Sequence, residues 1–343
     1  MTTAVASAAK QIPIVCPGHT RPLAELQYVH VTNDNDTNNA AGTAAGADNS
    51  NIFLLSACHD KMPMIRDGLT GDWIGTWVGH KGAVWSCQMD PTGNLAATAS
   101  GDYSARVWDA ITGQSLIELP HKHIVKTCVF SPNSQRLATG GKEASLRIYE
   151  LPQLLKQNSN NKKSDAPTTA TPALEITQES PITKLTWMTD ELLLCSCMNG
   201  KIYLWNTTNK TLVHTFDTKE GAEIRDMEVR AITGSQDQVI LTVAAGTKVY
   251  FFDLSESYKL INEYKMPIHF RDEGGCTLHP SGKKFVAGGS DLWVRVFDFE
   301  TGEQLECHKG HHGPIRCVRF SPDGRSYASG SEDGTIRLWK ASM

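Results

Sequence analysis

The chain has 343 residues, 40% of them apolar, and its 33 basic and 37 acidic residues give a net charge of −4. A charge so close to balance argues against a general polyanion-binding surface, because proteins with such a surface are normally strongly basic. No apolar run approaches the length of a membrane span, and the N-terminus lacks the charged start and apolar block of a signal peptide. We therefore expect a cytoplasmic and nuclear protein without membrane contact.

The first predicted elements are a strand over residues 11–16 and a Gly18-His19 pair that opens a degenerate first copy of a repeat. Residues 31–51 interrupt this copy between its first two strands with the segment VTNDNDTNNAAGTAAGADNSN. The segment is polar and nearly free of large apolar residues, a composition typical of disordered surface loops.

A clear repeat begins at residue 79. Residues 79–109 contain a Gly-His pair, an apolar strand, a Pro-x-Gly turn, a strand of small residues, an Asp turn and a strand that ends in an aromatic residue. Residues 120–150 follow the same order loosely, and residues 310–339 follow it closely. The aromatic residues that end the copies are spaced 41 to 56 residues apart: Trp108, Tyr149, Trp205, Phe252, Phe297 and Trp339. Seven copies at this period predict an all-β, seven-bladed propeller of four-stranded blades.

The predicted blades follow one another along the whole chain as a single domain. Their approximate bounds are 17–78, 79–119, 120–151, 177–216, 222–264, 267–308 and 310–340. A second polar insertion, at 152–173, is expected to join blades three and four as a disordered loop. We expect no helix, because no stretch has a convincing helical period.

The last copy is short of one strand, because only Lys340 to Met343 follow its final aromatic residue. The strand at 11–16 is available to complete it and to close the ring. Pro13 in this strand lacks an N–H donor, which suits an outermost position. An unpaired edge there would favour aggregation.

These motifs resemble the WD-repeat family over essentially the whole chain. The resemblance implies that a histidine, a strand Ser or Thr, a turn Asp and the final Trp form a hydrogen-bonded brace inside each blade. Complete sets are expected in blade two (His80, Thr98 or Ser100, Asp102, Trp108) and in blade seven (His311, Ser329 or Ser331, Asp333, Trp339). Ser100 and Ser331 are the preferred hydroxyl residues.

A histidine, a serine and an aspartate are also the residues of a catalytic triad. A triad has no reason to recur at the blade period, whereas a brace does, and so we expect no enzyme activity. His121 and His123 look like metal ligands, but His121 aligns with the brace histidines. The nine scattered cysteines fit reduced thiols in a β core. We expect no metal, cofactor or small-molecule substrate.

The WD-repeat resemblance also indicates where partners bind, because the family presents binding side chains around one mouth of the channel. The second residue of the first strand of a blade lies there. This offset selects Trp85 in blade two, Lys126 in blade three and Arg316 in blade seven. Aromatic and Arg side chains often dominate interfaces, so these three residues form the candidate rim.

Four sequence segments resemble one particular family of WD-repeat proteins. They are PGHTRPL (17–23), GDWIGTWVGHKGAVW (71–85), HKHIVKT (121–127) and the closing repeat. They are similar to the serine/threonine kinase receptor-associated proteins (STRAP), also called Unr-interacting proteins (Unrip). The resemblance implies a non-catalytic protein-interaction scaffold of the SMN complex, which assembles spliceosomal snRNPs for mRNA splicing. Implied partners are SMN, Gemin-type proteins and the RNA-binding protein Unr, and in animals the TGF-β receptor pathway, with RNA contacted only indirectly.

Two alternatives share the fold. The propeller (i) subunit of translation initiation factor three also contains a GHxGAVW phrase and a GHxGPI phrase, but HKHIVKT and GDWIGT favour the first family. The other alternative is a generic WD-repeat adaptor in kinase-receptor signalling. A propeller hydrolase is disfavoured because the repeat accounts for every candidate polar cluster.

Overall fold

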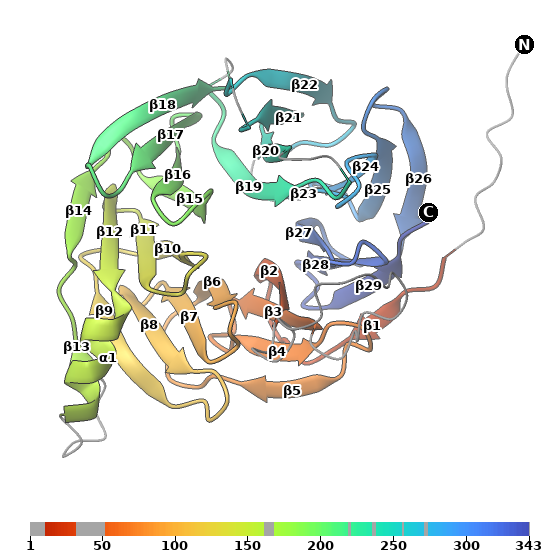
Figure 1. The fold of residues 1–343 in the computed structure, drawn as a ribbon. Coiled ribbons are helices and arrows are strands. Elements are labelled where there is room, and N and C mark those ends of the chain that lie inside the picture. The colour runs from red at the N-terminus through yellow and green to blue at the C-terminus, as the bar shows by residue number, and fades with distance from the viewer. Residues whose placement is uncertain are drawn as a thin grey trace, which may run out of the picture.

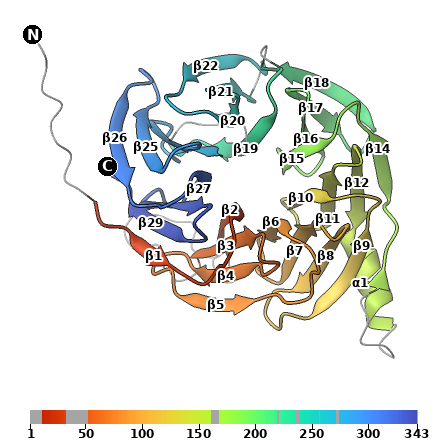
Figure 2. The same ribbon diagram turned by 180° about the vertical axis from the view of Figure 1, so that it is seen from behind.

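Seven sheets stand around a central axis like the blades of a propeller in the part of the chain that the structure describes (Figure 1). The computed structural model describes residues 11–31, 52–160, 168–218, 221–234, 238–255, 257–270 and 274–342. Figure 2 shows from behind the same progression of strands from the centre outward. The predicted seven-bladed all-β propeller is therefore confirmed.

Blades one to three contain the first fourteen strands except β1. Blade one consists of β2 (Leu23–His30), β3 (Ile52–Cys58), β4 (Met64–Asp67) and β5 (Trp73–Thr76). Blade two consists of β6 (Val84–Met89), β7 (Leu95–Ser100), β8 (Ser104–Asp109) and β9 (Ser115–Pro120), with β13 (Thr168–Thr169) added outside β9. Blade three consists of β10 (Val125–Phe130), β11 (Arg136–Gly141), β12 (Ser145–Glu150) and β14 (Leu174–Thr177).

Blades four to seven complete the ring. Blade four consists of β15 (Ile182–Trp187), β16 (Leu192–Cys197), β17 (Lys201–Asn206) and β18 (Thr211–Asp217). Blade five consists of β19 (Ile224–Ala231), β20 (Val239–Ala245), β21 (Lys248–Asp253) and β22 (Leu260–Lys265). Blade six consists of β23 (Gly275–Leu278), β24 (Lys284–Gly288), β25 (Trp293–Asp298) and β26 (Gln304–Lys309). Blade seven consists of β27 (Ile315–Phe320), β28 (Ser326–Ser331), β29 (Ile336–Lys340) and β1 (Ile14–Cys16).

The N-terminal strand closes the ring as predicted. β1 pairs antiparallel with β29, and Val15 lies opposite Arg337. Cys16 at the end of β1 is buried, and the side-chain amide of Gln11 donates a 2.7 Å hydrogen bond to the carbonyl of Lys340. The last blade thus takes its outer strand from the opposite end of the chain.

The second insertion differs from its prediction. Residues Leu151–Asn160 form a helix, α1, and β13 lies parallel to the outer strand of blade two. Leu151 and Leu154 are buried in the core cluster of that region, which also contains Ile117 and Leu119 of β9. The spacing of these two leucines is a helical signal that is easily missed in so polar a segment.

The same insertion lies inside blade three and does not join blades three and four. β14 pairs with β12, so that Ser145 lies opposite Thr177 and Ile148 opposite Leu174. Blade three therefore ends at residue 177, and not at 151, because the insertion replaces the short hairpin that leads to the outer strand elsewhere. The first insertion, 31–51, follows β2 and precedes β3, but residues 32–51 lie outside the described residues.

Large apolar side chains fill the spaces between blades. Trp77 and Trp108 are buried in one cluster with Leu55 and Val84, which joins blades one and two. Trp73 is 61% exposed on the outer strand β5. Ile74 beside it is also exposed, because an outermost strand has no neighbouring strand beyond it to cover its side chains.

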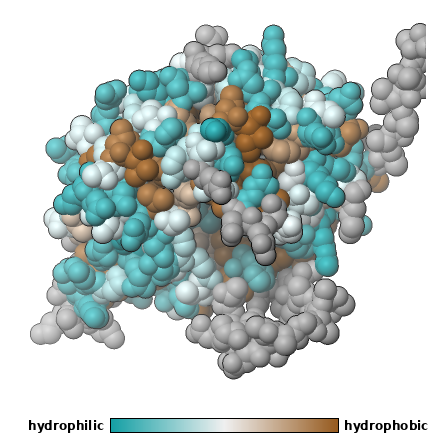
Figure 3. All heavy atoms as spheres, turned by 45° about the horizontal axis from the view of Figure 1, so that its top comes forward, coloured by the Kyte–Doolittle hydropathy of each residue, from teal (hydrophilic) through white to brown (hydrophobic). Residues whose placement is uncertain are grey.

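Apolar side chains are also exposed on other outer strands. Leu212 and Val213 of β18 and Leu260 and Ile261 of β22 are each between 37% and 46% exposed. Figure 3 shows apolar patches separated by polar side chains on the side of the molecule that carries these strands. Among the described residues, no helix has the length and apolar character needed to cross a membrane.

Candidate partner-binding site

The polar residues of blade two form a closed hydrogen-bonded chain. His80 contacts Asp102 through Nδ1 at 2.8 Å and the hydroxyl of Thr98 through Nε2 at 2.6 Å. Trp108 Nε1 donates to the same hydroxyl at 2.8 Å. Because Thr98 is fully buried, this hydroxyl satisfies two buried nitrogen atoms at once. The arrangement is that of an internal brace.

Ser100 has a different role from the one expected. Its hydroxyl donates to the carbonyl of Gly82 and accepts from the backbone N–H of Asp102, each at 3.2 Å. It therefore holds the turn that carries Asp102 and does not contact His80. Thr98 and Ser100 are two residues apart in β7 and point to the same side of the strand, so the sequence alone does not show which of them contacts the histidine.

Blade seven has the same geometry, and again the histidine contacts the hydroxyl two residues before the expected one. His311 contacts Asp333 at 3.1 Å and Ser329 at 2.8 Å, and Trp339 Nε1 donates to Ser329 at 2.8 Å. Ser331 donates instead to the carbonyl of Gly313 at 2.8 Å and accepts from the backbone N–H of Asp333. Both serines are fully buried, so the hydroxyl next to the histidine lies inside the blade.

Burial and hydrogen bonding in the blade-seven brace leave its histidine neutral and its aspartate charged at neutral pH. Burial lowers the pKa of His311 to about 4, although Asp333 opposes that shift. Burial acts to raise the pKa of Asp333, but hydrogen bonds from His312 and Thr335 hold it at about 2. At neutral pH a neutral imidazole therefore meets a carboxylate.

Blade three contains a variant brace. His121 contacts the carboxylate of Glu143 through Nδ1 and the hydroxyl of Thr139 through Nε2, the second at 3.0 Å. Glu143 also pairs with Arg147 at 3.2 Å. His123, the other residue with the look of a metal ligand, packs against Tyr103 and lies outside this group. His121 is thus committed to the blade.

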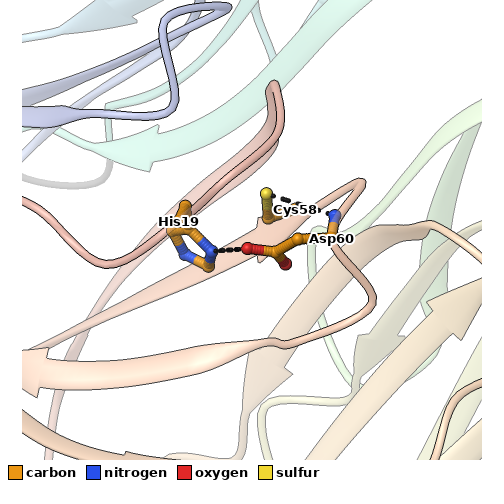
Figure 4. Close-up of side chains that lie close together, drawn as sticks. All are labelled: His19, Cys58 and Asp60. Carbon is orange, nitrogen blue, oxygen red and sulfur yellow. Dashed lines mark hydrogen bonds and ion pairs between the residues drawn. The ribbon is translucent and has the colours of Figure 1, made fainter.

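Blade one brings together His19, Cys58 and Asp60, whose donor atoms lie close enough to hold a metal ion (Figure 4). Both ring nitrogens of His19 are already engaged, by Asp60 and by Ser56, each at 2.8 Å. Burial raises the pKa of the Cys58 thiol to about 12, so this sulfur remains protonated and donates to the carbonyl of Arg21. His19 and Asp60 belong to the brace of blade one, and each donor atom of the cluster already has a hydrogen-bond partner.

The three candidate rim residues lie together at the mouth of the channel where the inner strands begin. Six inner strands carry a β-bulge after their first residue, and a bulge re-aims the side chain of the extra residue. The bulged residues are Ala24, Trp85, Lys126, Thr183, Arg225 and Arg316. All six line one hollow, which we call the mouth, together with Lys142, Lys184 and Glu223.

Two cations of this mouth, Arg225 and Lys142, are not among the predicted rim residues. Arg225 occupies the bulge position of blade five, the same offset that selects Trp85, Lys126 and Arg316. Blade five has no histidine five residues before its bulge, where His80, His121 and His311 stand in blades two, three and seven. Lys142 comes from the turn after β11 and directly precedes the acidic brace residue Glu143.

The indole of Trp85 organises one side of the mouth. The ammonium of Lys126 lies 3.0 Å from the centroid of its ring, and His59 packs against it edge-to-face at 4.3 Å between centroids. A cation over an indole contributes roughly 0.5–2 kcal/mol, depending on its exposure to water. Trp85 thereby fixes the position of Lys126.

Burial and like charges perturb two bases at the mouth. Burial lowers the pKa of Lys126 to about 7, Lys142, Arg225 and Lys184 contribute to the shift, and Glu223 opposes it. Burial, Arg316 and Lys126 together lower the pKa of His59 to about 4. Among the described residues, cations therefore act on both of these groups.

Seven blades of four or five strands, two of which contain a complete His–hydroxyl–Asp–Trp brace, define a WD-repeat propeller. The family model for the WD domain, G-beta repeat, matches residues 71–109, 113–150, 172–206 and 302–340. The serine-threonine kinase receptor-associated protein of Dictyostelium discoideum is 40% identical over 334 residues, which cover 96% of this chain and 98% of that protein. The chain belongs to the family of serine-threonine kinase receptor-associated proteins.

Other relatives support this assignment. The protein of the same name from Gallus gallus is 38% identical over 336 residues, covering 98% of this chain and 84% of its own length. Subunit I of eukaryotic translation initiation factor 3 from Drosophila sechellia is 28% identical over 342 residues, covering 95% of each chain. The difference in identity agrees with the preference that the sequence phrases indicate.

Proposed function

We propose that this protein is a non-catalytic scaffold that holds other proteins at the mouth of its channel. One observation carries the proposal: the polar residues of the braces are satisfied inside the blades, whereas the bulged residues Trp85, Lys126 and Arg316 meet at one half-buried, open hollow. An aromatic ring beside cationic side chains is a composition enriched at protein interfaces.

The assembly that we propose is the SMN complex, in which the protein would take part in spliceosomal snRNP assembly. The support is membership of the serine-threonine kinase receptor-associated family over nearly the full chain. SMN, Gemin-type proteins and an Unr-type RNA-binding protein are the proposed partners, so RNA is reached through proteins. The compartments that we propose are the cytoplasm and the nucleus.

Two other assignments compete with this one. The name of the relatives speaks of association with a kinase receptor, which fits an adaptor in TGF-β-type receptor signalling. The 28% identity to subunit I of initiation factor 3 keeps a role in translation initiation as the runner-up. All three assignments are scaffolding functions, and they differ in the proteins that are bound.

Affinity capture of the tagged full-length protein from cells that express it, followed by mass spectrometry, tests the proposal. We expect SMN, Gemin-type proteins and Sm proteins to be recovered. Recovery of initiation-factor subunits would assign the protein to translation, and recovery of receptor kinases would assign it to signalling. A tagged version of an unrelated propeller is the control for proteins that bind any β-propeller.

A further inference from the structure

Blade two has five strands in the part of the chain that the structure describes, because a short strand is added outside its outer strand. β13 lies parallel to β9, with Thr168 opposite Ile117 and Thr169 opposite Glu118. The backbone N–H of Ala170 also donates to the carbonyl of Glu118, at 3.3 Å. Figure 1 shows β13 beside β9 at the circumference of the propeller. The outer edge of a blade can therefore accept a further strand.

The added segment also brings apolar side chains to this edge. The pairing of β9 with β8 contains a bulge, and the extra residue is Leu116. Leu116 is partly buried against a cluster that contains Leu154 of α1 and Ala170, the residue after β13. Leu155 of α1 packs against the same cluster. A strand and apolar side chains thus together occupy the outer edge of blade two.

The outer strand of blade four, β18, has the same register as β9. In both blades the bulge follows the residue opposite the aromatic residue that ends the copy, Trp108 in blade two and Trp205 in blade four. The bulged residue of β18 is therefore Val213, the equivalent of Leu116, and it is 44% exposed beside Leu212 at 46%. Among the described residues, no further strand pairs with β18. Blade four thus exposes an edge whose counterpart in blade two is occupied.

The five remaining outer strands carry features that oppose the addition of a strand. β1, β5 and β14 have three or four residues each. β22 carries Glu263 and Lys265, and β26 carries Glu306 and Lys309. Short length and charged side chains are usual means by which edge strands are protected from pairing with another chain. β18 has seven residues, and residues 211–216 include no Asp, Glu, Lys or Arg.

We propose that the outer edge of β18 binds an extended segment of a partner protein, which adds to blade four as a fifth strand in the way that β13 adds to β9. The backbone of this segment lies opposite His214 and Thr215, which are the equivalents of Ile117 and Glu118. Main-chain hydrogen bonds supply affinity in such strand addition, and side chains supply specificity. This edge lies at the circumference and not at the mouth, so the inference goes beyond the proposed function.

The chemistry of the edge defines its occupant. Apolar side chains on the added strand would cover the exposed Leu212 and Val213, and an uncharged strand suits residues 211–216, which offer no opposite charge. A second copy of β18 fits less well, because two strands related by a two-fold axis run antiparallel, whereas β13 runs parallel to β9. The occupant is therefore an extended, uncharged segment of another protein that is rich in β-branched or other apolar residues.

Fluorescence anisotropy with the full-length protein tests this inference. The probe is a fluorescein-labelled peptide in which Thr and Val alternate between terminal lysines that keep it soluble. The matched probe has the same sequence with methylated backbone nitrogens, so that it cannot donate main-chain hydrogen bonds. We expect the first peptide to bind saturably and the methylated peptide to bind at least about tenfold more weakly.

The variant V213K/T215K places two charges on the edge of β18 and should weaken binding of the peptide by about tenfold or more. Both positions are exposed, so the core of blade four should keep its packing. The matched control is L305K/C307K, because Leu305 and Cys307 are exposed at the equivalent positions of β26. The control should bind as the wild type does, and thermal melting should show that both variants fold.

Hydrogen exchange measured by mass spectrometry locates the bound peptide independently of any variant. Strand addition engages backbone N–H groups at the edge, so exchange should slow in residues 211–217 when the peptide is bound. The methylated peptide should leave the exchange of this segment unchanged.

Several results would overturn the inference: no saturable binding, equal binding of the methylated peptide, slowed exchange in another outer strand instead of β18, or equal losses in the two double variants. Light scattering that shows a dimer in the wild type and a monomer in V213K/T215K would also overturn it, because a second copy would then occupy the edge. Peptide binding at β18 does not depend on which assembly is captured from cells, so this inference and the proposed function can fail separately.

Discussion

One hydroxyl group in each complete brace holds two buried nitrogen atoms. In blade two it belongs to Thr98, which contacts His80 and Trp108, and in blade seven it belongs to Ser329. The seryl neighbours two residues along the strand, Ser100 and Ser331, bond to backbone groups of the adjoining turns. The register of the sheet decides between the two hydroxyls, because the indole of the third strand reaches only one of them.

Replacing Thr98 tests this division of roles. Thr98→Val keeps the shape of the side chain but leaves His80 and Trp108 without a buried partner, so the free energy of unfolding should fall by about 2–3 kcal/mol. Thr98→Ser keeps the hydroxyl and should lose less, and Ser100→Ala should also lose less. Urea unfolding followed by circular dichroism gives the comparison. A Thr98→Val protein that unfolds like the wild type, beside a destabilised Thr98→Ser protein, would show that packing, and not the hydrogen bonds, stabilises this site.

Lys126 should make the stability of the protein depend on pH. Its pKa is lowered to about 7 in the folded protein by burial and by Lys142, Arg225 and Lys184, against the opposing Glu223. Below about pH 7 the ammonium of Lys126 is charged in the folded protein, where this charge is unfavourable. Between about pH 7 and the ordinary lysine pKa, Lys126 is neutral in the folded protein but still protonated in the unfolded chain. The contribution of this group to stability therefore rises with pH over that window.

The variant K126M removes the titrating group and should melt at a higher temperature than the wild type at about pH 6. The advantage should shrink as the pH rises above about 7, because the wild-type lysine then becomes neutral in the folded protein. His59 also lies near Lys126, and burial, Arg316 and Lys126 lower its pKa to about 4, so it stays neutral over this range. The exposed Lys265 provides the control K265M, whose melting temperature should follow the wild type at every pH. An advantage of K126M that stays constant with pH would contradict the prediction.

At the scale of elements, the second insertion shows how tertiary contacts override composition. Residues 151–160 read LPQLLKQNSN, a mostly polar segment, and form α1 because Leu151 and Leu154 pack beside β9. After the insertion the chain returns to blade three as β14, and its backbone pairs with β12. A strand of four residues with alternating burial is too short a pattern to be assigned to one blade from sequence.

The inner strands show the opposite case, in which a repeated pattern is informative. The bulge after the first residue recurs in six blades, so one offset along the sequence locates equivalent side chains at the mouth. The offset locates Trp85, Lys126 and Arg316, each five residues after a brace histidine. Blade five has no histidine at that position, so the sequence does not mark Arg225 in the same way.

At the scale of the whole molecule, β1 connects the two ends of the chain through its pairing with β29. Removal of residues 1–16 would leave the backbone groups of β29 without partners and would uncover the side of Leu338 against which Cys16 packs. We expect the melting temperature to fall sharply and the protein to aggregate as its concentration rises.

Scanning fluorimetry combined with light scattering measures both effects. Removal of residues 1–10 alone is the matched control, because the described pairing with blade seven begins at Gln11. The control should melt as the full chain does. A chain without residues 1–16 that melts like the full chain would show that β1 adds nothing to closure.

The sequence by itself determined the all-β class, the seven blades, the closing strand and the family, because these depend on local turn chemistry and on a period that recurs along the whole chain. Only the tertiary structure decided which hydroxyl braces each histidine, where blade three ends, and which cations gather at the mouth. These features depend on register and on contacts between blades far apart in sequence, such as the approach of Lys126 in blade three to Trp85 in blade two and to Arg225 in blade five. Spacing along one strand carries no information about such contacts.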